Sequence, residues 1–206
     1  MGKFSIIIPT MWFSNKLDCL IEELIKSELV SEIIIIDNNK SSNNKTKIVN
    51  EKLIILPQEE NIFVNPAWNL GVNISKNENI ILSNDDLCIS NINKVLLSIL
   101  NTNFDFIGLD YQNINKDNEV IITKTSGGMT KGFGCFMFIK KNKYIQIPEN
   151  IKIWFGDAIL HNSIENKGKL SCNNCDVELS KTIKSISNSL ETIKQDELNY
   201  NLWKLT

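Results

Sequence analysis

Arginine is absent from the 206-residue sequence, and all 22 basic residues are lysines. The planar guanidinium of arginine is the side chain best suited to bidentate binding of phosphate. Any phosphate that this protein binds must therefore be neutralised by lysine, backbone N–H groups, a helix N-terminus or a metal ion. The net charge of -2 is only a slight acidic excess. This excludes the basic footprint typical of proteins that bind nucleic acid or anionic membranes.

Long apolar runs are also missing, since none approaches the roughly 20 residues of a membrane span. The N-terminus shows no signal-peptide pattern. We therefore expect a cytoplasmic protein with no membrane span and no nucleic-acid partner. With 42% hydrophobic and 22% charged residues, the composition is that of a globular protein. We expect a single domain over residues 1–206.

Cysteine is limited to five scattered residues, which are Cys19, Cys88, Cys135, Cys172 and Cys175. An odd number in mostly apolar surroundings favours reduced core thiols over a disulfide framework. Cys172 and Cys175 have CxxC spacing, but no second pair accompanies them, so the spacing is weak support for zinc or a redox role.

Continuous apolar runs dominate the first part of the chain and predict buried strands at residues 3–10, 32–39, 52–57 and 79–86. Helical spacing at residues 17–25 predicts one helix, and Asn65-Pro66 resembles the cap and first position of another. Residues 1–86 thus alternate strand and helix. This pattern is typical of a mostly parallel, Rossmann-like α/β sheet covered by helices on both faces.

The rhythm changes in residues 87–206, where helices and strands are mixed. Helices are predicted at residues 91–100, from Asp157 onward, and at residues 187–202. Strands are predicted at residues 104–111, 119–125 and 134–141, the last two flanking a glycine-rich link.

Polar side chains follow several strands where each one ends. Thr10, Asp37 and the run Asn84-Asp85-Asp86 occupy these positions. Ligands of open parallel sheets bind beyond the carboxyl ends of the strands, so a crevice is expected there. The residues of each run are also common turn formers, which is the alternative for any one of them. GxGxxG and Walker motifs are absent from the sequence. In place of these motifs, a divalent cation bound by the paired carboxylates would be needed to hold a phosphate here.

These segments together resemble glycosyltransferase family 2, whose members have the GT-A fold. "SIIIPT" and "EIIIIDNN" resemble its first strand and its nucleotide-contacting second strand. "ENIFVNPAWNLGVNISKNENIILSNDD" is similar to the block that ends in the DXD-type motif. "GGMTKGFGCFMFIKK" resembles the glycine loop near the donor sugar, and "WFGDAILHNSIENKGK" the segment with the acceptor-activating aspartate. The likeness covers most of residues 3–170.

The resemblance implies roles by position in the nucleotide-binding half, residues 1–86. Thr10 and Asp37 would contact the base and ribose, and Asn69 would lie near the donor nucleotide. In the DXD-type run, Asn84 takes the usual first aspartate's place. Asp86 would bind Mn²⁺ or Mg²⁺, and Asp85 would point toward the ribose or a metal-bound water.

The same resemblance gives residues 87–206 the donor-sugar and acceptor side. Asp157 would be the general base, although an aspartate there also suits a helix N-cap. Gly156 stands where the family usually has a glutamate. Glu178 falls near the family's late metal-binding histidine and is a candidate metal ligand, whereas the only histidine, His161, is expected to be structural.

Two further side-chain types have candidate roles. Lys131 in the glycine loop is a possible second electrophile for the leaving diphosphate, with a solvated loop lysine as the alternative. Trp12 and Trp154 are candidates for the sugar pocket, although tryptophans are more often core residues.

We therefore expect a metal-dependent, inverting glycosyltransferase that moves a sugar from a nucleotide-diphosphate donor, UDP-linked, to a hydroxyl of a glycan acceptor. A non-catalytic nucleotide-sugar-binding module is the alternative from another class. A sugar-phosphate nucleotidylyltransferase is a second alternative, but it needs a glycine-rich basic loop after the first strand. "PTMWFSN" does not supply one.

Overall fold

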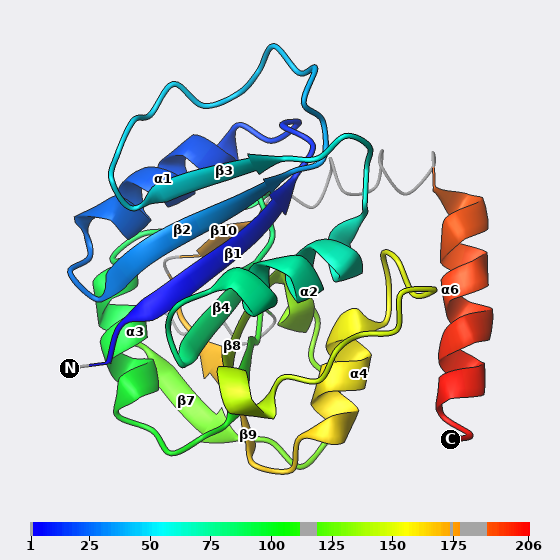
Figure 1. The fold of residues 1–206 in the computed structure, drawn as a ribbon. Helices are drawn as coiled ribbons and strands as arrows, with labels where there is room; N and C mark the ends of the chain where they lie inside the picture. The colour runs from blue at the N-terminus through cyan, green and yellow to red at the C-terminus, as the bar shows by residue number, and fades with distance from the viewer. Residues whose placement is uncertain (1, 112–118, 174, 178–188) are drawn as a thin grey trace.

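The computed structural model describes residues 2–111, 119–173, 175–177 and 189–206. Its centre is an eight-stranded sheet with the order β3-β2-β1-β4-β8-β6-β9-β7 (Figure 1). The strands of this sheet are β1 (Phe4–Thr10), β2 (Val30–Asp37), β3 (Leu53–Pro57), β4 (Asn79–Ser83), β6 (Phe106–Leu109), β7 (Ile121–Lys124), β8 (Phe136–Lys140) and β9 (Lys167–Ser171). A separate antiparallel pair joins β5 (Leu87–Ile89) to β10 (Cys175–Val177).

The direction of the strands divides the sheet as the sequence predicts. β1, β2, β3 and β4 are mutually parallel. β8 then runs antiparallel to both β4 and β6, and β7 is antiparallel to β9. A parallel half and a mixed half thus share one sheet, so the carboxyl ends of β1, β2 and β4 meet at one edge.

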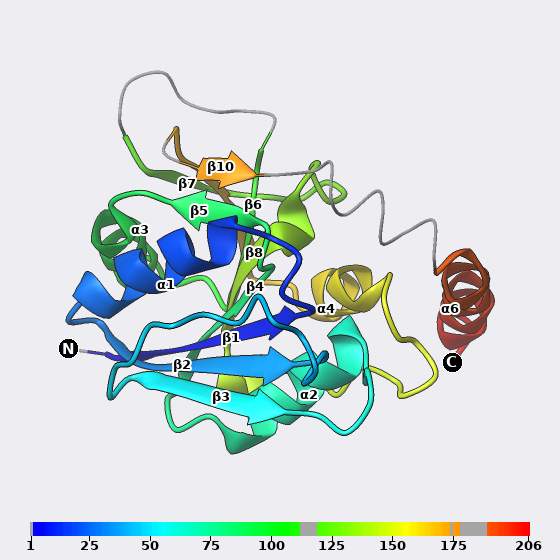
Figure 2. The ribbon, with the colours of Figure 1, turned by 90° about the horizontal axis from the view of Figure 1, so that it is seen from above.

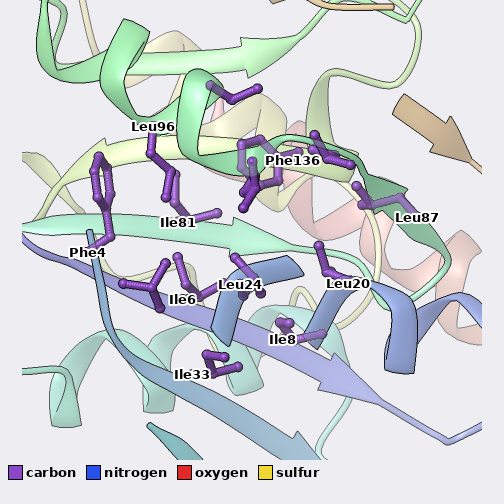
Figure 3. Packing of buried hydrophobic residues seen from close by; sticks show 14 of the residues in the cluster. Phe4, Ile6, Ile8, Leu20, Leu24, Ile33, Ile81, Leu87, Leu96 and Phe136 are labelled. Atoms are coloured by element: carbon purple, nitrogen blue, oxygen red, sulfur yellow. The ribbon is translucent and has the colours of Figure 1, made fainter. Parts of the chain in front are cut away.

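Helices cover both faces of the sheet because its strands are apolar on both sides (Figure 2). Ile6 and Ile8 of β1 pack with α1 (Lys16–Lys26) and α3 (Ile92–Leu100), as Figure 3 shows for part of that core. Ile7 points the other way and packs with α2 (Val64–Ile74) and α4 (Gly156–Ser163). Successive strand residues alternate between faces, so a continuous apolar run serves both cores.

Two details of the predicted elements are wrong. Residues 38–52 form a loop, so the strict alternation of strand and helix fails between β2 and β3. The second helix begins at Val64 rather than at an Asn65 cap. Phe63, with φ of 67°, takes the cap position, and the buried Asn65 side chain instead binds the backbone of a distant loop.

The expectation of reduced thiols is wrong for two cysteines, because Cys19 and Cys88 form a disulfide. Cys19 lies on α1, and Cys88 lies on β5, which packs against that helix. A pairing across 69 residues cannot be read from cysteine spacing. Cys135, Cys172 and Cys175 are not in disulfides. Among the described residues, no group of three or more histidine, cysteine or acidic side chains fits a metal ion.

The C-terminal helix, α6 (Leu190–Trp203), lies beside α4 and next to the loop that precedes α4 (Figure 1). The predicted first two residues of this helix, 187–188, are outside the described residues. No helix in the described part of the chain is both long enough and apolar enough to cross a membrane.

Candidate active site

A cavity of about 580 Å³ opens at the carboxyl ends of β1 and β4. Loops after these strands, the turn η1 (Phe133–Cys135) and the N-terminus of α4 form its walls. Its charged lining residues are Asp85, Asp86 and Asp157, and within the described chain no lysine lines it. Aromatic and methionine side chains supply much of the remaining surface, namely Met11, Phe13, Phe63, Trp68, Met129, Phe133, Trp154 and Phe155.

The DXD-type run lies between β4 and β5 and contributes Asn84, Asp85 and Asp86 to the cavity wall. The backbone N–H of Asn84 donates to the carbonyl of Cys135 (2.9 Å), which joins the end of β4 to the start of β8. The hydroxyl of Thr10 donates to Oδ2 of Asp85 at 2.5 Å, and itself accepts from Trp12 N. Thr10 thus fixes one carboxylate of the pair from the neighbouring strand.

Asp86 is buried, only 5% exposed, at the cavity wall. Mg²⁺ and Mn²⁺ prefer oxygen ligands, and Mg²⁺ is commonly held by one or two protein carboxylates together with phosphate oxygens and water. Asp86 and Asp85 supply carboxylate oxygens of this kind at the place where a phosphate would enter. The donor set therefore fits such a cation.

Asp157 also lines the cavity, in the first turn of α4. Burial raises the pKa of its carboxyl group and outweighs the hydrogen bond that Oδ1 accepts from Ala158 N. The N-cap alternative is wrong, because Phe155 takes that position with φ of 65°. A carboxylate with a raised pKa at a cavity wall has the properties of a general base.

Cys135 lines the same cavity as Asp86 and Asp157. Burial and the nearby carboxylates of Asp86 and Asp157 raise the pKa of its thiol to about 12. The thiol therefore stays protonated near neutral pH and is a poor nucleophile. Asp86 and Asp157 therefore both lie near this thiol.

Asp37 ends β2 beside Thr10, as the strand register requires, but its carboxylate is fully buried behind the cavity. Oδ1 accepts from the indole N–H of Trp12 (2.7 Å) and from Asn39 N (3.0 Å), and Oδ2 is 2.7 Å from Nζ of Lys45. Although burial raises it, the hydrogen bonds from Lys45, Trp12 and Asn39 hold the pKa of Asp37 below its usual value. Asn38, the next residue, lines the cavity instead.

Two other predicted residues, Asn69 and Lys131, are not among the residues that line the cavity. The amide of Asn69 donates to the carbonyl of Ile147 and accepts from Ile147 N and the hydroxyl of Tyr144. Asn69 therefore fastens the segment after β8 to α2. Lys131 is exposed, although its neighbours Thr130 and Gly132 line the cavity. Glu178 lies outside the described residues.

The two candidate tryptophans and the single histidine lie in different environments. Trp12 is 3% exposed and bonded to Asp37, whereas Trp154 is 43% exposed and lines the cavity. Of the two, only Trp154 therefore has an accessible face for a sugar ring. His161 packs edge-on against Phe133 with ring centroids 5.2 Å apart, and burial lowers its pKa. This is the structural role that the sequence favours for it.

Steric crowding explains why position 156 is a glycine rather than a glutamate. A Cβ on Gly156 would lie 2.1 Å from Oδ1 of Asn65. The Asn65 side chain, which holds the loop before α4, thus occupies the space that a glutamate would need.

At position 134 a Cβ would lie 2.5 Å from Oδ2 of Asp157, so a side chain there would push that carboxylate aside. We expect Gly134→Ala to displace that carboxylate and lower turnover by about 10²-fold, since small misplacements of reacting groups have effects of this size. Gly128→Ala is the matched control, because nothing lies within 4 Å of its Cβ position. Steady-state kinetics of both variants measure the difference, and equal turnover would show that Asp157 needs no fixed position.

Phe63 and Trp68 also line the cavity. The sequence does not predict this, because they belong to no polar run or glycine-rich motif. It also misses Ser189 and Ile193, which bring α6 to the cavity from the C-terminal end of the chain. Gly134, in contrast, could be predicted as a site residue from its place in the glycine-rich loop.

The fold is of the GT-A type, and its cavity contains three carboxylates. The sequence profile described as glycosyl transferase family 2 matches residues 5–159. The chain therefore belongs to glycosyltransferase family 2. No curated protein matches the sequence.

Several solved structures have a similar fold. The chain superposes on residues 1–349 of TarS from S. aureus with a TM-score of 0.60 and 16% identity, covering 82% of this chain and 58% of that one. The same TarS fragment with UDP gives a TM-score of 0.58 at 16% identity, covering 82% and 58% of the two chains. GalNAc-T7 with UDP, GalNAc and Mn²⁺ gives 0.60 at 12% identity, covering 85% and 43%. The chain thus spans little more than half of the TarS fragment.

Proposed function

We propose that this glycosyltransferase uses a UDP-sugar and a divalent cation, Mn²⁺ or Mg²⁺, and transfers the sugar to a glycan hydroxyl with inversion. The observation that carries the proposal is the charge of the cavity: three carboxylates and, among the described lining residues, no cation. Three carboxylates repel a diphosphate, and a divalent cation bound to them would offset this repulsion. The chain's lack of arginine strengthens the same conclusion.

The donor side is built from Thr10, Asp85 and Asp86. In the proposed complex, Asp86 holds the cation and Asp85 is kept in place by the Thr10 hydroxyl. When bound, the cation supplies Lewis-acid stabilisation of the charge that develops on the leaving diphosphate. UDP is the favoured nucleotide because the TarS structure and the GalNAc-T7 structure contain it.

The acceptor side is built from Trp154 and Asp157. Asp157 accepts the proton of the acceptor hydroxyl as its oxygen bonds to the anomeric carbon. The bond from that carbon to the diphosphate oxygen breaks, and UDP leaves with the electron pair. A single displacement of this kind inverts the anomeric centre. The neutral Cys135 thiol offers no competing nucleophile.

A thermal-shift panel of UDP-, GDP-, CMP- and dTDP-sugars, with and without Mn²⁺, tests the proposal. We expect only the UDP-sugar with Mn²⁺ to raise the melting temperature, by an amount equivalent to about 2.7 kcal/mol at a hundredfold excess over Kd. A similar shift without metal would contradict the role of the cation. Stabilisation by UDP-sugar and Mn²⁺ without any release of UDP would favour the non-catalytic module instead.

A further inference from the structure

The segment that carries Trp154 into the cavity, residues 150–155, is held by the C-terminal helix. We call this segment the entry loop, because it leads into α4 and Asp157. Figure 1 shows it extending from the body of the protein toward α6. The family profile ends at residue 159, so α6 lies outside the matched region.

Asp196 of α6 is 1% exposed and makes three hydrogen bonds to the entry loop. Its Oδ1 accepts from Lys152 N at 2.7 Å. Its Oδ2 accepts from Ile153 N at 2.7 Å and Trp154 N at 3.0 Å. Hydrogen bonds to an ionised acceptor are stronger than those between neutral groups. One carboxylate thus fixes three consecutive residues of the loop.

Tyr200, one turn further along α6, stacks on Phe155 with ring centroids 4.7 Å apart and an interplanar angle of 11°. Phe155 has φ of 65°, a conformation rare for a bulky side chain, and it is the cap residue of α4. Such a backbone persists only when its surroundings hold it. Asn199 adds a bond from Nδ2 to the carbonyl of Asn150 at 2.5 Å.

The opposite side of the entry loop is fastened by α2. Nδ2 of Asn65 donates to the carbonyls of Ile151 at 3.1 Å and Trp154 at 3.0 Å. The loop is therefore clamped between two helices, while the indole of Trp154 remains partly exposed in the cavity. Ser189 and Ile193 of α6 reach the same cavity.

We propose that α6 is the element that builds the acceptor side of the site, with Asp196 and Tyr200 as its positioning residues. They keep the exposed face of Trp154 in place to stack on a sugar ring of a glycan acceptor, and they fix the start of α4 so that Asp157 meets the acceptor hydroxyl. The role rests on the proposed function. Neither residue touches the reacting atoms.

Asp196→Ala tests the clamp, with Glu197→Ala as the matched control because Glu197 is exposed on the same helix. Two quantities are measured: UDP affinity in Mn²⁺ by calorimetry, and UDP release with p-nitrophenyl glycosides as acceptors. We expect UDP affinity to stay within about twofold while kcat/KM for the acceptor falls by about 10- to 100-fold. Glu197→Ala should match the wild type in both.

Hydrogen exchange read by mass spectrometry reports on the clamp directly. In Asp196→Ala, residues 150–157 should exchange faster while β1, β2 and β4 remain protected. If Asp196→Ala does not fold, Tyr200→Ala is the second test and should show the same faster exchange in residues 150–157. Its control is Leu198→Ala, because Leu198 is exposed on the same helix.

Three outcomes would overturn the inference: unchanged exchange in the entry loop, unchanged acceptor kinetics, or a parallel loss of UDP affinity and turnover, which would reduce α6 to a general stabiliser. A wild-type protein that binds no UDP with Mn²⁺ would instead contradict the proposed function. The exchange experiment would still show whether α6 holds the loop, so the two failures are distinguishable.

Discussion

Asp157→Asn should bind UDP and Mn²⁺ as the wild type does and yet lose transfer by about 10²- to 10⁴-fold, the contribution expected of a general base. Asparagine keeps the size of the side chain and an oxygen for the N–H of Ala158, which now bonds to Oδ1 of Asp157. It cannot accept the proton of the acceptor hydroxyl. Single-turnover kinetics beside calorimetry separate the two effects, and undiminished transfer would assign the base to another residue.

The same substitution should stabilise the fold near neutral pH. Burial raises the pKa of Asp157, so between its ordinary value of 3.8 and the raised value the native state binds more protons than the unfolded state. Its contribution to stability therefore falls as pH rises through that window and stays low above it. Asp157→Asn removes this penalty, so its melting temperature should equal or exceed that of the wild type at pH 7. The gain should vanish below the ordinary pKa.

Turnover of the wild type has a matching pH dependence. A general base acts only when ionised, so the acid limb of the rate should lie above the usual range of an aspartate because the pKa is raised. Asp157→Asn should lose this limb. The persistence of the same limb in the variant would assign it to a different group.

Asp86→Ala should abolish metal-dependent nucleotide binding. Changes beyond the direct ligands of a metal already cost about 10- to 100-fold in affinity or activity, so loss of the direct ligand should lower UDP affinity in Mn²⁺ by at least about 100-fold. The remaining cavity would still contain Asp85 and Asp157, which repel the diphosphate. Calorimetry with UDP and Mn²⁺ measures the effect.

Asp18→Ala is the control for that experiment, since Asp18 is an exposed aspartate on α1. It should bind UDP as the wild type does. Retained UDP affinity in Asp86→Ala would assign the cation to another residue.

Much of the fold is predictable because its strands are continuous apolar runs that end in polar residues. Such runs identify β1, β2 and β4, and the rule that parallel strands end at one edge brings Thr10, Asp85 and Asp86 to one cavity. The side-chain direction of Asp37 is less predictable. Successive residues at a strand end face opposite ways, and here Asn38 faces the cavity while Asp37 faces Trp12 and Lys45.

Contacts between distant segments set the limit of prediction. The Cys19–Cys88 disulfide depends on the packing of α1 against β5, and neither its pairing nor its geometry is encoded in cysteine spacing. The bonds from Asp196 to the entry loop span more than forty residues and involve backbone N–H groups, which every residue type other than proline offers. Such hydrogen bonds therefore cannot be predicted from the pattern of side chains in the sequence.

Titration of UDP into the wild-type protein, once with Mn²⁺ and once with EDTA, tests the central claim most directly. A cavity with three carboxylates, and without a described lysine in its lining, should bind UDP in Mn²⁺ and show no measurable binding in EDTA. Equal affinity in both titrations would contradict the claim that a cation at Asp86 holds the diphosphate.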